Sequence, residues 1–146
     1  MNQAILDFIE YKRIAVIGAS RKGDKFGNMA SKELRERGYQ VFIVHPEVNE
    51  IDGEPCYPNL TAVKDKVDGV FVCIPAAQAS GVFRQASEAG LRNVWLQQQA
   101  ETPELIELGE ELDLDLVYGK FILMYAPPVR SYHEVHRFFV NLFGQL

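Results

Sequence analysis

The stretch that decides the fold is Ile14-Ala15-Val16-Ile17-Gly18-Ala19-Ser20. Four apolar residues in a row are typical of a short strand in a sheet that is covered on both faces. The glycine that follows allows a tight turn, and a polar loop, residues 21–26, leads into a helical pattern that opens at Gly27. A strand, a turn and a helix in this order predict the first unit of a doubly wound α/β fold.

Four further apolar runs follow and alternate with helical patterns. The predicted strands are residues 14–17, 41–44, 69–74, 93–96 and 114–118, and the helices expected between them are 28–37, 79–89 and 102–112. This alternation predicts parallel strands joined by right-handed crossovers. We therefore expect an α/β, Rossmann-like, doubly wound parallel sheet of five strands in the order 3-2-1-4-5. The connection 47–68 is expected to hold at most one short helix, at 61–66.

Two amphipathic helices are expected to flank the sheet. Residues 2–10 place apolar side chains on one face before the first strand. A capping-box pattern at Ser131 and Glu134 opens a C-terminal helix. Its apolar residues recur at spacings of three and four: Val135, Phe138, Phe139, Leu142 and Phe143. This helix either packs on its own domain or provides the surface for a homodimer or a partner protein.

The composition indicates one ordinary globular domain over residues 1–146. Apolar residues make up 47% and charged residues 24% of the chain, which excludes a disordered sequence. The formal net charge of −5 argues against nucleic acid as a partner. No apolar run is long enough to span a membrane and the N-terminus lacks a signal-peptide pattern, so we expect no membrane partner and a cytoplasmic location. Two cysteines, Cys56 and Cys73, are too few for a disulfide framework.

The loop after the first strand has the properties of an anion site. Arg21, Lys22 and Lys25 place three cations in a short stretch of an otherwise acidic chain, next to the hydroxyl of Ser20. The backbone N–H groups at the helix start near Gly27 add further attraction for an anion. A phosphate-bearing small molecule is the ligand that this combination favours.

The same loop differs from the dinucleotide fingerprint Gly-x-Gly-x-x-Gly. That motif sets its first and third glycines five positions apart, whereas Gly18 and Gly27 are nine apart and Ser20 replaces the middle glycine. A dinucleotide site also uses an acidic residue at the end of the second strand to hold the ribose hydroxyls, and this sequence has His45-Pro46 there. Both differences favour a phosphate-rich nucleotide over NAD, and an NAD(H)-responsive module stays the alternative.

Four segments taken together resemble a known family. They are the run 18–27, His45-Pro46, Cys73-Ile74-Pro75 and Trp95-Leu96-Gln97-Gln98. In this order and at this spacing they resemble the small stand-alone CoA-binding proteins, which are single-domain relatives of the CoA-binding domain of the succinyl-CoA synthetase alpha subunit. The resemblance covers residues 5–123.

The resemblance implies a CoA site built from residues at the ends of the strands. Gly18, Ala19 and Ser20 would lie at the pyrophosphate, with Arg21 and Lys25 near phosphate charge and Gly27 at the start of the helix. His45 and Pro46 would lie at the adenine or ribose. Ile74, Pro75 and Gln97 would lie along the cleft wall. One segment departs from the family: Tyr118-Gly119-Lys120-Phe121 stands where relatives often have Asp-Arg-Cys. Any chemistry that depends on that cysteine is absent from this chain.

No other group in the sequence points to catalysis or to a metal site. His133 and His136 form a His-x-x-His pair, but no cluster of cysteines or carboxylates completes it, and we interpret both as surface residues. Cys56 has no neighbouring base that would activate its thiol. We therefore expect a protein that binds CoA or an acyl-CoA as a non-catalytic carrier, sensor or regulatory module. The alternatives are the NAD(H)-responsive module and a subunit of a CoA-dependent enzyme that needs a partner chain.

Overall fold

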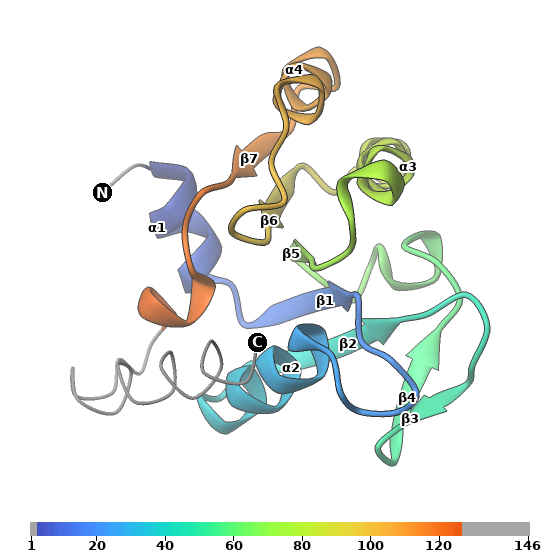
Figure 1. Ribbon diagram of the computed structural model, residues 1–146. Coiled ribbons are helices and arrows are strands. Elements are labelled where there is room, and N and C mark those ends of the chain that lie inside the picture. Colours follow the sequence, from blue (N-terminus) through green and yellow to red (C-terminus); the bar gives the residue numbers. More distant parts are fainter. Residues whose placement is uncertain (1–2, 127–146) are drawn as a thin grey trace.

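The protein is described by a computed structural model over residues 3–126, which form a seven-stranded sheet with helices on both faces (Figure 1). The strands are β1 (Arg13–Ile17), β2 (Gln40–Val44), β3 (Glu50–Ile51), β4 (Glu54–Tyr57), β5 (Gly69–Val72), β6 (Asn93–Leu96) and β7 (Asp115–Val117). The helices are α1 (Gln3–Glu10), α2 (Phe26–Glu36), α3 (Ala76–Glu88) and α4 (Pro103–Glu111), with single 3-10 turns η1 (Thr61–Val63) and η2 (Ile122–Met124).

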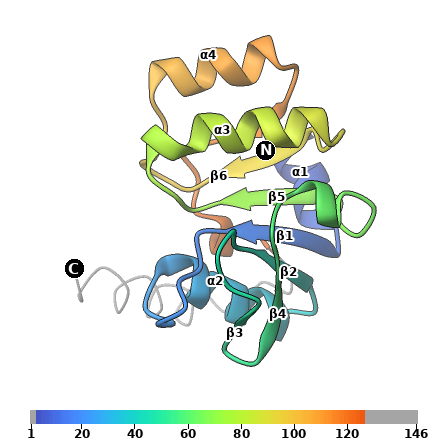
Figure 2. The same ribbon diagram turned by 90° about the vertical axis from the view of Figure 1, so that its right-hand side faces the viewer.

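The strands lie in the order β3-β4-β2-β1-β5-β6-β7. All neighbours are parallel except β3 and β4, which form an antiparallel hairpin. β1, β5 and β6 end at the same edge of the sheet, and from that edge the chain passes into α2, α3 and α4 (Figure 2). The direction of winding reverses at β1, which lies between β2 and β5. In doubly wound folds ligands bind outside the carboxyl ends of the strands at such a point.

The prediction of an α/β Rossmann-like fold is confirmed, but the predicted strand count and order are wrong. The five predicted strands lie in the order 2-1-3-4-5, because β5 pairs with β1, and Ile14 stands opposite Gly69. The place beside β2 is taken by β4, which lies in the connection where only a short helix was expected. Its neighbour β3 has only two residues. Pro55, which lies in β4, is tolerated because the β3–β4 hairpin forms the edge of the sheet. Asp52-Gly53 was the available signal, since φ values of 51° and 79° are those of a type I′ hairpin turn.

Alternate residues of the central strands face different helices, as expected for a sheet covered on both sides. Ile14 and Val16 of β1 pack with α1, α2 and η2, whereas Ala15 and Ile17 pack with α3 and α4. Figure 1 shows α3 and α4 on one side of the sheet and α1 and α2 on the other. The predicted N-terminal helix is therefore present as α1, and its Phe8 contacts the buried ring of Trp95 edge-on, with ring centroids 5.3 Å apart.

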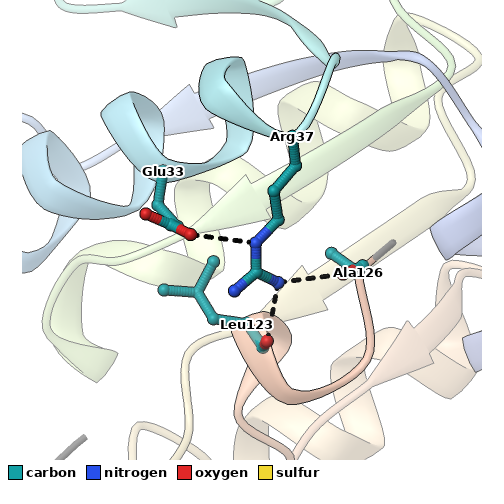
Figure 3. A network of polar contacts seen from close by, with 4 residues as sticks. All are labelled: Glu33, Arg37, Leu123 and Ala126. Atoms are coloured by element: carbon teal, nitrogen blue, oxygen red, sulfur yellow. Dashed lines mark hydrogen bonds and ion pairs between the residues drawn. The ribbon is translucent and has the colours of Figure 1, made fainter. Parts of the chain in front are cut away.

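A buried ion pair fastens the segment after β7 to α2 (Figure 3). The guanidinium of Arg37 donates to Glu33 Oε1 over 3.0 Å and to the carbonyl oxygens of Leu123 and Ala126 over 2.7 and 2.8 Å. Arg37 and Glu33 are only 7% and 6% exposed. Buried charges are tolerated when they are paired and hydrogen-bonded in this way. The predicted C-terminal helix, with His133 and His136, lies outside the described residues.

No helix within residues 3–126 is long and apolar enough to cross a membrane. Over the same residues, no group of three or more His, Cys, Asp and Glu side chains could hold a metal ion.

Candidate functional site

A cleft of about 1110 Å³ runs along the carboxyl ends of β1, β2, β5 and β6. It lies where the order of the strands predicts a ligand, on both sides of β1. The structure brings ten of the eleven sequence-predicted site residues to this cleft. They are Gly18, Ala19, Ser20, Arg21, Lys25, His45, Pro46, Ile74, Pro75 and Gln97. Gly27 does not line the cleft, and its role is in the packing beneath it.

The two glycines of the loop let three backbone segments approach one another. Gly18 has a φ of +124°, and a Cβ on it would lie 2.7 Å from the Cβ of Cys73 at the end of β5. A Cβ on Gly27 would lie 2.7 Å from the carbonyl carbon of Gly18. Real Cβ atoms do not make contacts this short, so each position requires glycine. The start of α2 therefore packs directly on the end of β1, with no side chain between them.

Asn28 holds the loop in place, a role that sequence reasoning missed. Its side-chain oxygen accepts hydrogen bonds from the backbone N–H groups of Ser20 (2.8 Å) and Lys25 (3.2 Å), and its amide nitrogen donates to the carbonyl of Ser20 (2.9 Å). Asn28 is 8% exposed, so these bonds are shielded from water. The available signal was an Asn in the first turn of a helix, a residue type that readily bonds nearby backbone groups.

The hydroxyl of Ser20 already has partners within the loop. It donates to Asp24 Oδ1 over 2.8 Å and accepts from the backbone N–H of Lys22 over 3.1 Å. The hydrogen bond from Ser20 is the largest cause that lowers the pKa of Asp24 below its ordinary value. The hydroxyl of Ser20, which the sequence assigned to a phosphate, therefore donates to the carboxylate of Asp24 instead. The cationic side chains of Arg21, Lys22 and Lys25 are exposed, and none forms an ion pair with another residue between 3 and 126.

His45 closes the cleft at the end of β2. Its backbone N–H donates to the carbonyl of Tyr57 over 2.9 Å, which fixes the turn beside β4. Its Nδ1 accepts from the backbone N–H of Glu47 over 3.1 Å, so the neutral ring carries its proton on Nε2. His45 thus offers an N–H donor at the end of β2, where a dinucleotide site would have a carboxylate acceptor.

The end of β5 supplies an apolar wall. The backbone N–H of Cys73 donates to the carbonyl of Ile17 over 2.8 Å, which extends the pairing of β1 and β5, and Pro75 is the N-cap residue of α3. Burial raises the pKa of the Cys73 thiol well above its ordinary value. Burial is also the largest cause that raises the pKa of Cys56. Neither thiol is activated as a nucleophile, since reactive cysteines have a lowered pKa.

The loop after β6 supplies polar side chains. The backbone N–H of Gln97 donates to the carbonyl of Val72 over 2.9 Å, which brings the loop 97–102 beside the end of β5. Gln98, Gln99 and Glu101 also line the cleft there, although the sequence assigned a place in the site only to Gln97. The predicted helix start is confirmed, because Thr102 Oγ1 accepts from the backbone N–H of Leu105 over 3.1 Å.

In the segment that departs from the resemblance, Phe121 is part of the core, whereas Tyr118, Gly119 and Lys120 are exposed. Phe121 is 8% exposed, and its ring lies 5.8 Å from that of Phe26 at the start of α2. The carbonyl of Lys120 accepts from Trp95 Nε1 over 3.0 Å. Phe121, which stands where the resemblance implies a cysteine, therefore packs against the start of α2.

Comparison with known proteins gives one family match and several relatives. The profile of a family described as a CoA binding domain matches residues 12–127. The ADP-forming acetate–CoA ligase I of Archaeoglobus fulgidus is 30% identical over 116 residues, which are 73% of this chain and 17% of the ligase. The uncharacterised protein YneT of Bacillus subtilis is 30% identical over 68% of this chain and 74% of its own length. A solved conserved hypothetical protein of Pyrococcus furiosus superposes with a TM-score of 0.72 at 32% identity, over 76% of this chain and 96% of that one. The chain thus spans about a sixth of the ligase and most of the two small proteins.

Proposed function

Because the chain belongs to the family of CoA binding domains, we propose that it binds CoA or a CoA thioester in the cleft at the ends of β1, β2, β5 and β6. We propose that it does so as a non-catalytic carrier, sensor or regulatory module, with residues 1–146 acting as one domain. The observation that carries the proposal is the loop 18–25, which brings three exposed cations to the point where the sheet reverses, in a chain that matches this family over residues 12–127.

The cations are suited to the phosphates of CoA. Arg21, Lys22 and Lys25 line the cleft at the end of β1 and form no ion pair with another described residue. A pyrophosphate that lies there meets charge-assisted donors, which are stronger than neutral ones. Asp24 must release the hydroxyl of Ser20 before that hydroxyl can donate to a phosphate, because it now donates to the carboxylate.

The remaining cleft residues suit the other parts of the ligand. His45 and Pro46 lie at the end of β2, beside the phosphate loop, and we assign the adenine or ribose to them. Ile74, Pro75 and Gln97 continue the cleft across β5 and β6, and we assign the pantetheine arm to this part. NAD is disfavoured, because His45 offers a donor where the ribose hydroxyls of NAD need an acceptor.

Titration calorimetry with CoA, dephospho-CoA and NADH tests the proposal. We expect CoA to bind, dephospho-CoA to bind more weakly because it lacks the 3′-phosphate, and NADH to give no heat of binding. Lys25→Ala should weaken CoA binding by about 1–3 kcal/mol if its ammonium meets a phosphate. Lys64→Ala removes the same charge from an exposed position outside the cleft and is the matched control. Absence of CoA binding, or an equal effect of the two variants, would refute the proposed phosphate site.

A second candidate function is a subunit that becomes catalytic with a partner chain. It is favoured by the acetate–CoA ligase relative, of which the chain covers only 17%. The purified chain with acetate, ATP and CoA should form no acetyl-CoA under either proposal. Co-purification with a second protein, together with acetyl-CoA formation by that complex, would favour the subunit, whereas CoA binding by a chain that purifies alone would favour the module.

A further inference from the structure

Among residues 3–126, the lysines and arginines that line the cleft all lie in the loop after β1. Arg21, Lys22 and Lys25 lie in the loop after β1, together with the carboxylate of Asp24, whereas the loop after β6 contributes Glu101 and three glutamines, residues 97–99, but no cation. β5 lies between β1 and β6, so the loops after β1 and β6 are about 10 Å apart, the width of two strand spacings. A long ligand that lies across these strands meets cations at one end and a carboxylate at the other.

The β6 end also has hydrogen-bond acceptors without donors. Gln98 Oε1 and Glu101 Oε2 are both buried, and neither accepts a hydrogen bond from a residue within the described part of the chain. Buried acceptors are nearly always paired, and leaving one unpaired is costly. The other oxygen of Glu101 lies 4.0 Å from where a Cβ on Gly119 would be, so this carboxylate lies against the loop after β7. A bound ligand with hydrogen-bond donors could pair with these two oxygen atoms.

The backbone of the same loop is in an uncommon conformation. Gln99 has a φ of +72°, a left-handed value that residues other than glycine seldom adopt. Such strain tends to occur where a loop contacts a ligand. The strained residue Gln99 and the two unpaired acceptors therefore lie in the same loop, 97–102, which lines the cleft.

We infer that the loop 97–102 selects the acyl group of a CoA thioester by charge, with Glu101 as the specificity-determining residue. The inference rests on the proposed function, which places the phosphates at the β1 loop and therefore the sulfur end toward β6. Acyl groups that carry an ammonium or another hydrogen-bond donor pair with Glu101 and Gln98. Acyl groups that end in a carboxylate, such as those of dicarboxylic acids, meet a like charge and are rejected, since a like charge at close range disfavours binding.

Three stable thioethers of CoA, similar in size and different in charge, test this inference without hydrolysis. They are S-(2-aminoethyl)-CoA, S-propyl-CoA and S-carboxymethyl-CoA, each titrated calorimetrically beside CoA itself. We expect the aminoethyl derivative to bind at least about tenfold more tightly than the carboxymethyl derivative, with the propyl derivative between them. In Glu101→Gln, which keeps the shape and removes the charge, this preference should fall to less than about twofold.

Glu104→Gln is the matched control. Glu104 is exposed in the first turn of α4, three residues from Glu101 and outside the cleft, so its loss of charge should leave the preference unchanged. Thermal unfolding of both variants verifies that they are folded. Equal binding of the aminoethyl and carboxymethyl derivatives by the unmodified protein, or a preference that survives in Glu101→Gln, would overturn the inference while CoA binding stands. Failure of CoA and of all three derivatives to bind would instead overturn the proposed function and the inference with it.

Discussion

The two ends of helix α2 carry polar networks of opposite kinds. At the N-terminal end, Asn28 bonds to Ser20 and Lys25, which are eight and three positions away in the sequence. At the C-terminal end, Arg37 bonds to the carbonyls of Leu123 and Ala126, which are 86 and 89 positions away. The first network shapes a loop beside the cleft, and the second joins two distant parts of the chain on the face of the sheet that α1 and α2 cover (Figure 3).

The difference separates ligand binding from stability along a single helix. Local hydrogen bonds at the N-terminal end fix a loop whose cations stay exposed, so this end is suited to a ligand. Long-range bonds at the C-terminal end hold the segment after β7 and pair Arg37 with three acceptors, so this end is suited to stabilising the fold. Changes at the C-terminal end should therefore alter the free energy of unfolding, and changes at the N-terminal end should also alter the affinity for CoA.

The largest effect is expected from Arg37→Met. Removing the guanidinium leaves the carboxylate of Glu33 and two carbonyl oxygens without this partner in a buried site, which should lower the free energy of unfolding by about 3–5 kcal/mol. Urea denaturation measures the loss, and CoA affinity of the folded variant should be unchanged. The double variant Arg37→Met with Glu33→Leu should recover part of the stability, because apolar replacements of a buried pair are tolerated. A loss of unfolding free energy below about 1 kcal/mol would contradict this account, because it would mean that the pair contributes no more than a surface salt bridge does.

Gly27→Ala should have the next largest effect and should act on both properties. The added Cβ would lie 2.7 Å from the backbone of Gly18, and backbone atoms at this junction cannot move aside without shifting the loop. We expect a loss of about 3 kcal/mol, the upper end for overpacking, together with weaker binding of CoA. Gly81→Ala is the control, since it lies inside α3 with no atom within 4 Å and should be stabilising by about 0.5–1 kcal/mol. Similar unfolding curves for both variants would contradict the proposed close packing.

Asn28→Ala should cost less stability but should affect binding. It leaves the backbone N–H groups of Ser20 and Lys25 without their acceptor, at a cost of about 2 kcal/mol. The loop 20–25 then loses its fixed shape, so we expect the affinity for CoA to fall in calorimetric titration. Ser31→Ala is a suitable comparison, because among residues 3–126 the hydroxyl of Ser31 bonds only the carbonyl of Gly27 within the same helix. If Asn28→Ala bound CoA as tightly as Ser31→Ala does, the loop would not need this side chain.

The smallest effect is the dependence of stability on pH. The pKa shift behind it is upward at the C-terminal end of α2 and downward at the N-terminal end. Burial raises the pKa of Tyr39, just beyond α2, to about 12, and its hydroxyl donates to the carbonyl of Ile9 over 2.6 Å. The stability gained there is complete below about pH 10, where an unfolded tyrosine titrates, and is lost as the pH rises toward 12. The lowered pKa of Asp24 acts oppositely: its contribution is present above the ordinary carboxyl pKa and is lost as the pH falls below that value.

Tyr39→Phe tests the alkaline side. We expect it to cost about 1 kcal/mol near neutral pH, because one hydrogen bond is lost. It should also reduce the decline in unfolding free energy above about pH 10. Urea denaturation from neutral to alkaline pH measures both. If the unfolding free energy of the variant fell just as steeply at alkaline pH, groups other than Tyr39 would be responsible for the decline.

The sequence was sufficient to predict those parts of the molecule that depend on local pattern. The apolar run at 14–17 and the loop 21–26 identified the fold class and the position of the cleft, and the helical pattern at 102–112 identified the start of α4. The hairpin β3–β4 was missed because its strands are short and one contains Pro55, although the Asp52-Gly53 turn was visible. The contacts of Arg37 were beyond reach, because no spacing rule relates a residue to carbonyls more than 80 positions away.

The predicted site was incomplete for a similar reason. Ser20 was assigned to a phosphate from its residue type, whereas in the folded loop its hydroxyl donates to Asp24. Gln98 and Glu101 received no role, because their importance depends on burial without a partner, which only three-dimensional packing reveals. Residue type and spacing thus indicated which segments meet at the cleft, and the structure shows which donors and acceptors within those segments already have partners.

Hydrogen–deuterium exchange with and without CoA tests the central claim most directly, because it reports each end of α2 separately. With CoA at about 100 times its dissociation constant, at which nearly all of the protein is bound, we predict slower exchange in residues 18–28 and 97–102. At residues 33–37 and 122–126, exchange should slow no more than it does in the rest of the core, where CoA acts only by stabilising the whole fold. Selective protection at 33–37 and 122–126, or no protection at 18–28, would contradict the assignment of ligand binding to the N-terminal end of this helix.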